Sequence, residues 1–375
     1  MNIDNKKCRE NCSGCGACYL VCPQKAISMN EDKHGFMYPM VNDSECIDCG
    51  LCYKKCPIND KTIHKSIAAF YGWNNDKSIR MKSSSGGLFS GLADYVLGLD
   101  GIVYGAVFDL ETKKVKYKGT DEVELDSIRR SKYTECYTEE IFQKIKDLLN
   151  QGENILFCGT PCHVAGLEKY LGKKYDTLIT CDFVCGGAAS PEFFRQHLHE
   201  MEKKYNSKVS DINFRDKKMG WKRMLFSVKF KNGKKKSTLS YFEPYFNGFI
   251  EGIIKRENCF SCKFSANHYS DITLADYWGY LKSGVSYDRR GISMAIANTE
   301  KGLKALQSIC NNVTLTEMEL DCTKYTVQTR VFNQAKFDRR NAFFELADNI
   351  GYEKAAKVTY MKSPLKDLIF SYIKR

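Results

Sequence analysis

Residues 12–23 read Cys12-Ser-Gly-Cys15-Gly-Ala-Cys18-Tyr-Leu-Val-Cys22-Pro23, and residues 46–57 repeat the pattern as Cys46-Ile-Asp-Cys49-Gly-Leu-Cys52-Tyr-Lys-Lys-Cys56-Pro57. Both stretches have the spacing C-x2-C-x2-C-x3-C-P. Three cysteines spaced in this way can curl around one small inorganic group, while the fourth, next to proline, points away from it. We expect each half of this repeat to fold as a short strand, a cysteine loop and one helical turn.

The spacing is that of the ligands in a bacterial-type ferredoxin with two 4Fe–4S clusters, where the fourth cysteine of each stretch binds the other cluster. It therefore assigns Cys12, Cys15, Cys18 and Cys56 to one cluster, and Cys46, Cys49, Cys52 and Cys22 to the second. Zinc sites usually combine two C-x2-4-C pairs across a long gap, which fits this pattern poorly. A disulfide scaffold is also disfavoured, because no secretory signal precedes the cysteines, and we expect a cytoplasmic protein.

The length of the chain leaves room for a second, larger unit. It has 375 residues, of which a ferredoxin unit needs about 60. No run of 18 apolar residues exists, so we expect no membrane-spanning helix. The formal net charge of +12 could indicate nucleic-acid binding. Each cluster with its four thiolates offsets this charge by about −2, and Lys234-Lys235-Lys236 reads as the tip of a β-hairpin, so we expect no nucleic-acid partner.

Beyond residue 66 the apolar spacing alternates between strands and helices. Strands are expected at 67–73, 101–108, 154–157 and 177–180, and helices at 88–97, 141–149 and 163–171. A strand, a glycine-containing turn, a helix and another strand predict an α/β layer with parallel pairing, whereas residues 209–240 alternate like antiparallel strands. Residues 363–375 read as a basic amphipathic helix, more typical of a docked terminal helix than of a membrane-surface anchor.

A serine- and glycine-rich loop, Ser83-Ser84-Ser85-Gly86-Gly87, precedes the helix expected at 88–97. Free backbone N–H groups and the helix dipole favour an anion at such a position, and glycine lets a phosphate approach the backbone. The alternative is an ordinary helix start in which a serine side chain caps the first turn. The sequence leaves these two interpretations open.

Cysteines continue into the second unit. They fall in three groups, namely Cys158 and Cys162 after one expected strand, Cys181 and Cys185 after the next, and the loop pair Cys259-Phe-Ser-Cys262. In an open parallel sheet, ligands bind outside the carboxyl ends of the strands, which is where the first two groups are expected. A single buried cysteine is often inert, but three groups of them, two at the ends of expected strands, are less easily dismissed.

These features, in this order, resemble the beta subunits of coenzyme F-420 hydrogenases and dehydrogenases. The resemblance runs from about residue 66 to 345, behind a ferredoxin module like that of the input subunit of some F-420H2 dehydrogenases. The same domain also resembles chlorophyll-pathway reductases. The stretches that carry the resemblance are Ser84–Gly87, Ser131-Lys132-Tyr133, Leu156–Cys162, Asp182–Cys185, Cys259–Cys262 ahead of Asp271–Gly279, and Gly291–Gly302.

The chain departs from the family pattern at two places. It has Cys185-Gly186-Gly187 where the family usually has Cys-His-Gly, and Ala275-Asp276 where Gly-Asp is common. The missing histidine removes a proton donor or hydrogen bond near the site, which affects the family's usual substrate more than its cofactors.

The resemblance implies a bound FAD and a third 4Fe–4S cluster. The cluster ligands would be Cys162, Cys185, Cys259 and Cys262, with Cys158 and Cys181 close enough in sequence to be rival ligands. The flavin would contact Ser84, Ser85, Gly86, Gly87, Ser131, Lys132, Tyr133, Gly159 and Thr160. The candidate catalytic residues are Lys132 as a cation near the phosphate or ring, His163 as a proton shuttle and Asp276 in the pocket wall. The alternatives are a surface lysine, a helix-surface histidine and strand-end packing.

A flavin exchanges two electrons at once with an organic substrate, whereas iron–sulfur clusters pass electrons singly. We therefore expect a flavin-dependent iron–sulfur oxidoreductase that passes electrons between a two-electron carrier, such as a reduced deazaflavin, and one-electron carriers. The alternative is an electron-transfer subunit of a larger hydrogenase or dehydrogenase complex with no substrate of its own. The expected partners are a redox protein, such as ferredoxin or a subunit of that kind, and a small-molecule redox substrate.

The expected fold class is α+β. A dicluster ferredoxin-like domain is expected at 1–60, followed by a mixed α/β flavin- and iron–sulfur-binding domain. Residues 66–150 would form the N-terminal part of that domain, and 151–345 its C-terminal part with the third Fe–S site. A C-terminal helical tail is expected at 346–375.

Overall fold

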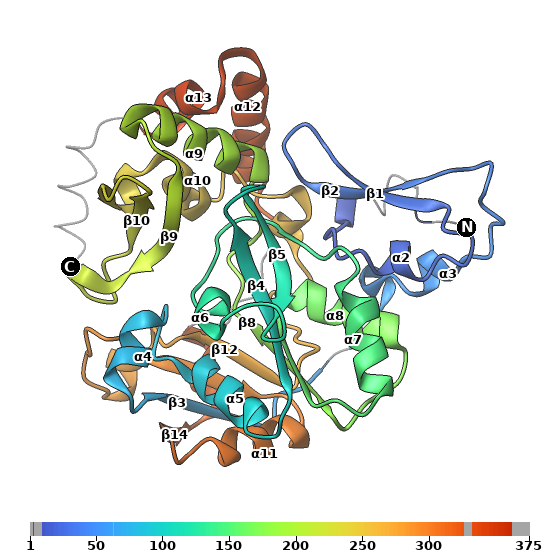
Figure 1. Cartoon of the computed structure of the whole chain (residues 1–375), viewed down its shortest axis with the longest axis vertical. Coiled ribbons are helices and arrows are strands. Elements are labelled where there is room, and N and C mark those ends of the chain that lie inside the picture. Colours follow the sequence, from blue (N-terminus) through green and yellow to red (C-terminus); the bar gives the residue numbers. More distant parts are fainter. Residues whose placement is uncertain (1–2, 4–9, 63, 326–331, 362–375) are drawn as a thin grey trace.

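The computed structural model describes residue 3 and residues 10–62, 64–325 and 332–361. In Figure 1 a small blue N-terminal lobe projects from a larger body. The body contains a long sheet and, next to it, a group of helices with a second sheet. The helix predicted at 363–375 lies outside the described residues.

The N-terminal lobe contains an antiparallel hairpin between the two cysteine stretches. Its elements are α2 (Ala17–Leu20), β1 (Ile27–Glu31), β2 (Met37–Val41), α3 (Leu51–Lys54) and the 3-10 helix η1 (Pro57–Asn59). The helices α2 and α3 are single turns, and each follows a glycine of positive φ, Gly16 at 75° and Gly50 at 72°. Glycine adopts this conformation without steric cost. The predicted helical turns are confirmed, and in the second half β2, the cysteine loop and α3 follow one another in the predicted order. Residues 4–9, which precede the first cysteine stretch, lie outside the described residues. The strands β1 and β2 satisfy each other's hydrogen bonds between the two stretches.

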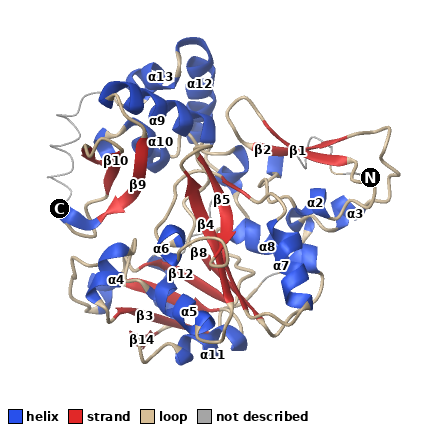
Figure 2. Ribbon diagram, viewed as in Figure 1, coloured by secondary structure: helices blue, strands red, loops and turns tan. Residues whose placement is uncertain are grey.

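The body is organised around a nine-stranded mixed sheet, red in Figure 2. Its order is β14-β3-β13-β12-β8-β7-β4-β5-β6, with parallel pairing from β12 through β8 and β7 to β4. The strands are β3 (Ala68–Asn74), β4 (Ile102–Asp109), β5 (Lys114–Gly119), β6 (Cys136–Tyr137), β7 (Ile155–Cys158), β8 (Leu178–Phe183), β12 (Ile272–Asp276), β13 (Ser293–Ala297) and β14 (Val313–Met318). The prediction of a mixed α/β domain behind a ferredoxin-like lobe is therefore confirmed.

Helices cover both faces of this sheet because its central strands bury both sets of side chains. Along β7, Ile155 and Phe157 pack with α7 and α8 on one face, whereas Leu156 packs with α5 and α11 on the other. Alternate residues of a strand point to opposite faces, which is why such strands read as continuous apolar runs. The helices are α4 (Lys77–Lys82), α5 (Leu88–Leu97), α6 (Leu125–Ile128), α7 (Ile141–Asn150), α8 (Pro161–Leu171) and α11 (Glu300–Ser308). Among the described residues, no helix is both long and apolar enough to cross a membrane.

An antiparallel sheet with its own helices completes the body. The strands β9 (Val209–Asp216), β10 (Leu225–Phe230) and β11 (Lys235–Leu239) pack with α9 (Pro191–Tyr205), α10 (Pro244–Glu251), α12 (Gln334–Ile350) and α13 (Tyr352–Thr359) around an aromatic core. The antiparallel strands predicted at 209–240 are confirmed, and Gly233 turns the hairpin just before Lys234. The tail expected from residue 346 begins inside α12. The remaining 3-10 helices are η2 (Lys217–Met219), η3 (Ser240–Phe242), η4 (Glu257–Ser261), η5 (Tyr280–Ser283) and η6 (Leu320–Tyr325).

His197 holds three helices of this region together. It lies on α9, and its two ring nitrogens contact Glu243, ahead of α10, and Glu353 of α13. Burial alone would lower the pKa of His197, but the two carboxylates raise it to about 9. The folded protein therefore retains a proton that the unfolded chain releases above a pH of about 6.5. The resulting stabilisation is fully present below that pH and is lost as the pH rises through about 9.

We expect the free energy of unfolding to fall by about 2–3 kcal/mol as the pH rises from about 6.5 to about 9, because of this proton. The fall should be much smaller in His197→Gln, whose side chain does not titrate. Denaturant unfolding of both proteins at the two pH values, followed by far-ultraviolet circular dichroism, measures the difference. An equal fall in the free energy of unfolding in the two proteins would show that His197 does not cause this pH dependence.

Candidate functional site

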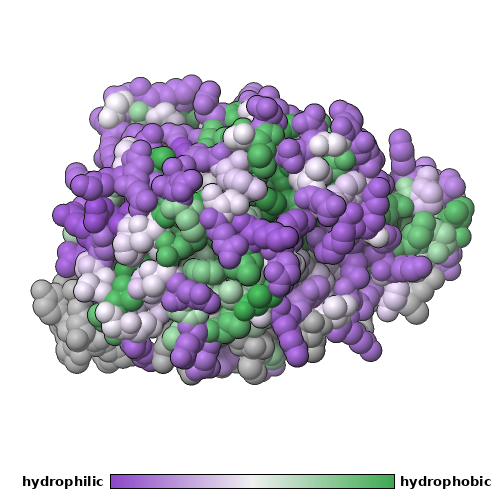
Figure 3. Space-filling view, turned by 90° about the horizontal axis from the view of Figure 1, so that it is seen from below, coloured by the Kyte–Doolittle hydropathy of each residue, from purple (hydrophilic) through white to green (hydrophobic). Residues whose placement is uncertain are grey.

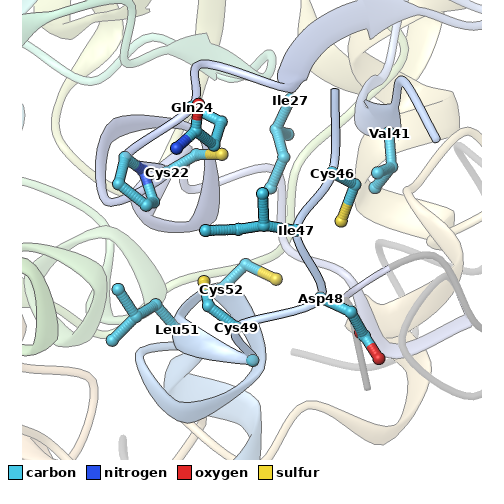
Figure 4. Close-up of a pocket in the computed structure, with 12 residues that line it drawn as sticks. Cys22, Gln24, Ile27, Val41, Cys46, Ile47, Asp48, Cys49, Leu51 and Cys52 are labelled. Carbon is cyan, nitrogen blue, oxygen red and sulfur yellow. The ribbon is translucent and has the colours of Figure 1, made fainter. Parts of the chain in front are cut away.

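Four cysteines of the N-terminal lobe surround one pocket. Cys22, Cys46, Cys49 and Cys52 line a space of about 360 Å³, and Figure 4 shows their sulfur atoms around it. Burial raises the pKa of Cys52, and the nearby thiols of Cys49 and Cys22 add to the rise. These four are the predicted ligands of the second cluster. Their arrangement around a common space is the one that such a cluster requires.

The cysteines predicted for the other cluster lie where the lobe meets the body. Burial raises the pKa of Cys18, and the thiols of Cys12, Cys15 and Cys56 add to the rise, so the four lie close together. A Cβ atom built on Gly166 of α8 would lie 3.0 Å from the Cys15 sulfur. Helix α8 therefore packs directly against this set of thiols.

A third set of thiols gathers in the body. Burial raises the pKa of Cys162, and the thiols of Cys262, Cys185 and Cys259 add to the rise. No three His, Cys, Asp or Glu side chains of the described residues lie close enough together to hold a single metal ion. Cys162 precedes Gly166 by about 6 Å along α8, so two of the predicted ligand sets meet on one helix.

Backbone groups point at the sulfur atoms of the third set. The N–H of Gly187 donates to the Cys185 sulfur at 3.3 Å, and the N–H of Ala188 donates to the Cys259 sulfur at 3.4 Å. Such bonds stabilise negative charge on thiolates and help to set the potential of an iron–sulfur cluster. The chemistry of this donor set therefore fits a 4Fe–4S cluster.

Cys158 and Cys181, the rival ligands, contact each other. They are register partners on the parallel strands β7 and β8, and the contact between their thiols raises the pKa of Cys181. The Cys181 thiol is fully buried and donates to the carbonyl of Asp182 at 3.5 Å. The sequence left the choice of third-cluster ligands open, because Cys158, Cys162, Cys181 and Cys185 all fall near the ends of two neighbouring strands. Which of them face a common site depends on the directions of their side chains.

A cavity of about 1790 Å³, including its open mouth, joins the third set of thiols to the predicted flavin-binding residues. All but one of the predicted flavin-binding, catalytic and third-cluster residues line this cavity. They are Ser84, Ser85, Gly87, Ser131, Lys132, Tyr133, Gly159, Thr160, His163, Asp276, Cys162, Cys185, Cys259 and Cys262. Gly86 is the exception. It is buried behind the loop, where a Cβ atom would lie 2.6 Å from the carbonyl oxygen of Gly72.

The serine- and glycine-rich loop presents an uncapped helix end to this cavity. Gly87, with a φ of 90°, is the N-cap of α5, and no side chain caps the first turn, so the serine-cap alternative is wrong. Ser84 accepts a hydrogen bond from the backbone N–H of Ser131 at 2.9 Å, which joins two segments far apart in sequence. Arg129 and Arg130 also line the cavity. Uncapped N–H groups with two cations nearby fit a diphosphate. Sequence analysis missed both arginines, although they directly precede Ser131.

Two comparisons with protein families match separate parts of the chain. Residues 11–59 match the 4Fe-4S dicluster domain, which supports the two predicted N-terminal clusters. Residues 152–322 match the C-terminal region of the coenzyme F420 hydrogenase/dehydrogenase beta subunits. This region of the chain is similar to that beta-subunit family. The chain is thus an iron–sulfur electron-transfer protein related to F420 hydrogenase and dehydrogenase beta subunits.

A search of curated proteins found no match. Among solved structures, the chain is similar to one from the F420-reducing [NiFe] hydrogenase complex of Methanosarcina barkeri. The two share 16% sequence identity with a TM-score of 0.47, over 78% of this chain and 96% of that one. The third set of thiols lies entirely within the region that matches the beta-subunit family.

The ammonium group of Lys132 is bonded to backbone carbonyls. Lys132 lies ahead of the region that matches the beta-subunit family. Its ammonium group donates to the carbonyls of Ser127 (2.9 Å), Ile128 and Arg129 (2.8 Å each) at the end of α6. Burial and, to a smaller extent, the nearby charge of Arg130 lower the pKa of Lys132 to about 7. The surface-lysine alternative is therefore wrong. With three carbonyl partners, the Lys132 amine stabilises the end of α6, which leaves Arg129 and Arg130 as the better candidates for a phosphate.

His163 lies inside the protein. Its Nδ1 is 3.0 Å from the hydroxyl of Tyr117, and its side chain is 3% exposed, so the helix-surface alternative is wrong. Burial lowers the pKa of His163 to about 4, and the ring is therefore neutral near pH 7. A neutral ring has one donor and one acceptor nitrogen, so the role of His163 as a proton shuttle stays a prediction.

Asp276 is fixed in the cavity wall by two side chains. Its carboxylate accepts hydrogen bonds from Arg215 at 2.8 Å and from the indole N–H of Trp221 at 2.7 Å. Burial disfavours the charge on Arg215, but Asp276 raises the pKa of the guanidinium above its ordinary value. Trp221 also stacks on Trp278, with ring centroids 4.6 Å apart. Arg215 could not be predicted as a neighbour of Asp276 because it comes from β9 of the other sheet.

Gly186 stands where the family usually has histidine, and in this chain a side chain at this position would collide with a neighbour. A Cβ atom on Gly186 would lie 2.6 Å from the ring of Phe249, which belongs to α10 and lines the cavity. A histidine here would displace that ring. The cavity of this chain is therefore more apolar at this point than the Cys-His-Gly pattern implies.

Arg256 joins the N-terminal lobe to the cavity wall. Its guanidinium donates to the carbonyl oxygens of Cys12 and Met37, both at 2.7 Å. It also forms an ion pair with Glu135 at 2.9 Å, in which the side chains are 1% and 2% exposed. Burial disfavours the charge on Arg256, but Glu135 raises its pKa. Sequence analysis missed this residue, because its partners lie far away along the chain.

Two glycines of the first cysteine stretch also lie against the body. A Cβ atom on Gly14 would lie 3.1 Å from a carboxylate oxygen of Glu135, and one on Gly16 would lie 2.7 Å from the Thr138 hydroxyl. Both have positive φ. The contact between lobe and body therefore depends on the absence of side chains at these positions.

Proposed function

We propose that this chain is a flavin-dependent iron–sulfur oxidoreductase that passes electrons between an organic two-electron substrate and one-electron carriers. The observation that carries the proposal is a single cavity lined both by an uncapped helix end and by four converging thiols. FAD bound there would supply two-electron chemistry toward the substrate and one-electron chemistry toward the clusters. The matched family is named for coenzyme F420, so a reduced deazaflavin is the first substrate to test.

The chain's own residues would hold the flavin in two ways. The first N–H groups of α5, with the guanidinium groups of Arg129 and Arg130, would bind the diphosphate. Phe183 and Phe249 line the same cavity and would exclude water from the ring. Arg130 has a φ of 74°, a conformation that costs energy for any residue with a side chain and often marks a functional position.

The three sets of thiols lie in series. Cys162 and Gly166 share α8, and Gly166 packs against Cys15 of the lobe. The thiol of Cys52 in turn raises the pKa of Cys18, so the two sets of the lobe adjoin each other. This order would connect the cavity with the outer face of the lobe.

Cofactor content tests the proposal. Anaerobically reconstituted protein should contain about twelve irons and about one FAD per chain. Arg130→Gly should lower the FAD content and leave the iron content unchanged, because glycine accepts the positive φ while the cation is removed. Eight irons and no flavin would reduce the protein to a ferredoxin fused to a binding domain.

Substrate reduction tests the enzymatic part. Reduced deazaflavin, NAD(P)H or reduced ferredoxin should bleach the flavin absorbance of the reconstituted protein. If none of the three does so, an enzyme of this kind is contradicted.

The second candidate is an electron-transfer subunit with no substrate of its own. It is favoured by the exposed apolar side chains around η5, where Trp278, Leu281 and Tyr287 are 40%, 67% and 44% exposed. Exposed apolar groups of this size mark protein contact surfaces. This candidate predicts stable co-purification with a partner, and a monomer that turns over alone would contradict it.

A further inference from the structure

The outer pocket of the N-terminal lobe opens onto an apolar surface. Ile47 and Leu51 border the pocket of Cys22, Cys46, Cys49 and Cys52 in Figure 4, and they are 61% and 38% exposed. Cys49 is itself exposed, whereas Cys15 and Cys18 are buried toward the body. In Figure 3 hydrophobic surface is visible on the projecting end of the molecule. Of the predicted cluster sites, this is the one with an exposed ligand thiol.

One segment at this surface, residues 43–48, is acidic, although the chain as a whole is basic. Asp43, Glu45 and Asp48 are all exposed, and the exposed lysines next along the chain are Lys33 and Lys54. Lys25, which follows Gln24 of the pocket wall, is also exposed. The sequence contains no lysine or arginine between Lys33 and Lys54, although the whole chain has a formal net charge of +12. We call Asp43, Glu45, Ile47, Asp48 and Leu51 the outer patch.

We propose that the outer patch docks a one-electron carrier protein whose contact face has basic side chains around an apolar centre. The proposal rests on the proposed electron-transfer role and names the partner for its outer end. An apolar centre excludes water between the two redox sites, while opposite charges at the rim steer the partner and fix its orientation. A partner seated here would contact Cys49 directly.

The charge of the outer patch also excludes a class of partner. An acidic ferredoxin would place carboxylates against Asp43, Glu45 and Asp48, and like charges across an interface disfavour the complex. At the outer patch, a basic-faced carrier is therefore favoured over an acidic ferredoxin.

Electron transfer to two acceptors of opposite charge tests the proposal. Reconstituted full-length protein is reduced with dithionite, freed of the excess, and mixed in a stopped-flow instrument with ferric cytochrome c, a small basic haem protein. One electron leaves the reduced protein and converts the haem iron from ferric to ferrous. The second acceptor is an oxidised acidic plant-type ferredoxin.

We compare the wild type with Asp43→Lys/Glu45→Lys/Asp48→Lys and with a control of equal charge change, Glu111→Lys/Asp176→Lys/Glu200→Lys, at exposed positions elsewhere. At low ionic strength the patch variant should reduce cytochrome c about tenfold more slowly than the wild type, and the control within about twofold. The patch variant should reduce the acidic ferredoxin faster than the wild type does. High salt should remove these differences.

Three outcomes would overturn the proposal. The first two are equal rates of cytochrome c reduction in the two triple variants, and a wild type that reduces the acidic ferredoxin faster than cytochrome c. The third is a salt-sensitive dimer that the patch variant abolishes, which would assign the patch to a second copy of this chain. The neutral variant Asp43→Asn/Glu45→Gln/Asp48→Asn should give an intermediate rate, and it replaces the lysine variant if that one loses iron. Dithionite reduces the clusters without a flavin, so absence of flavin would contradict the proposed function and leave this test intact.

Discussion

Replacing Cys185 by alanine is expected to remove four irons per chain, leaving about eight of about twelve. Cys185 adjoins Cys162 in the third set of thiols, and alanine offers no ligand in its place. The N-terminal cysteines lie in another lobe and should keep their iron. Iron and sulfide analysis of anaerobically reconstituted protein measures the loss.

Cys181→Ala is the matched control. Cys181 is a neighbour in sequence, but its thiol is buried and contacts Cys158. This variant should keep about twelve irons. If Cys181→Ala loses four irons and Cys185→Ala loses none, the assignment of the third set is wrong.

Replacing Arg256 by methionine is expected to lower stability by about 3–5 kcal/mol, because it leaves the Glu135 carboxylate buried without its partner. It also leaves the carbonyl oxygens of Cys12 and Met37 without this donor. The denaturant concentration at which the clusters lose their visible absorbance, under anaerobic conditions, should fall accordingly. Proteolysis between lobe and body should become faster.

The double variant Glu135→Gln/Arg256→Met separates the effect of the unpaired Glu135 charge from the effect of the hydrogen bonds lost with Arg256. It removes the uncompensated carboxylate, so it should be more stable than Arg256→Met alone. Equal stability of the two variants would show that the lost hydrogen bonds, and not the buried charge, account for the effect.

Much of the fold was predictable because its signals are local. Strand β7 is buried on both faces, so Ile155, Leu156 and Phe157 form an uninterrupted apolar run. The cysteine stretches are equally local, since three ligands of one cluster fall within seven residues. The register partners of a strand are not local, and the sequence therefore did not show that β1 and β2 pair with each other.

The parts of the site that were missed depend on contacts between distant segments. Arg256 and Cys12 are 244 residues apart, and Arg215 reaches Asp276 from another sheet. The hydrogen-bond partners of Lys132 could not be predicted for a related reason. Its neighbours in sequence showed a cation close to a loop, but the direction of its amine is set by the end of α6.

The contact of Gly14 with the body gives the N-terminal repeat a polarity. In the repeat, Ser13 and Gly14 correspond to Ile47 and Asp48. Turning the lobe end for end would bring the Asp48 carboxylate against Glu135, where even a Cβ atom would lie 3.1 Å from a carboxylate oxygen, and would carry the apolar Ile47 inward. The two halves therefore cannot exchange places, although their cysteine spacing is identical. A ferredoxin unit grafted from another protein would need this same asymmetry, and not merely the same cysteines, to seat itself on this body.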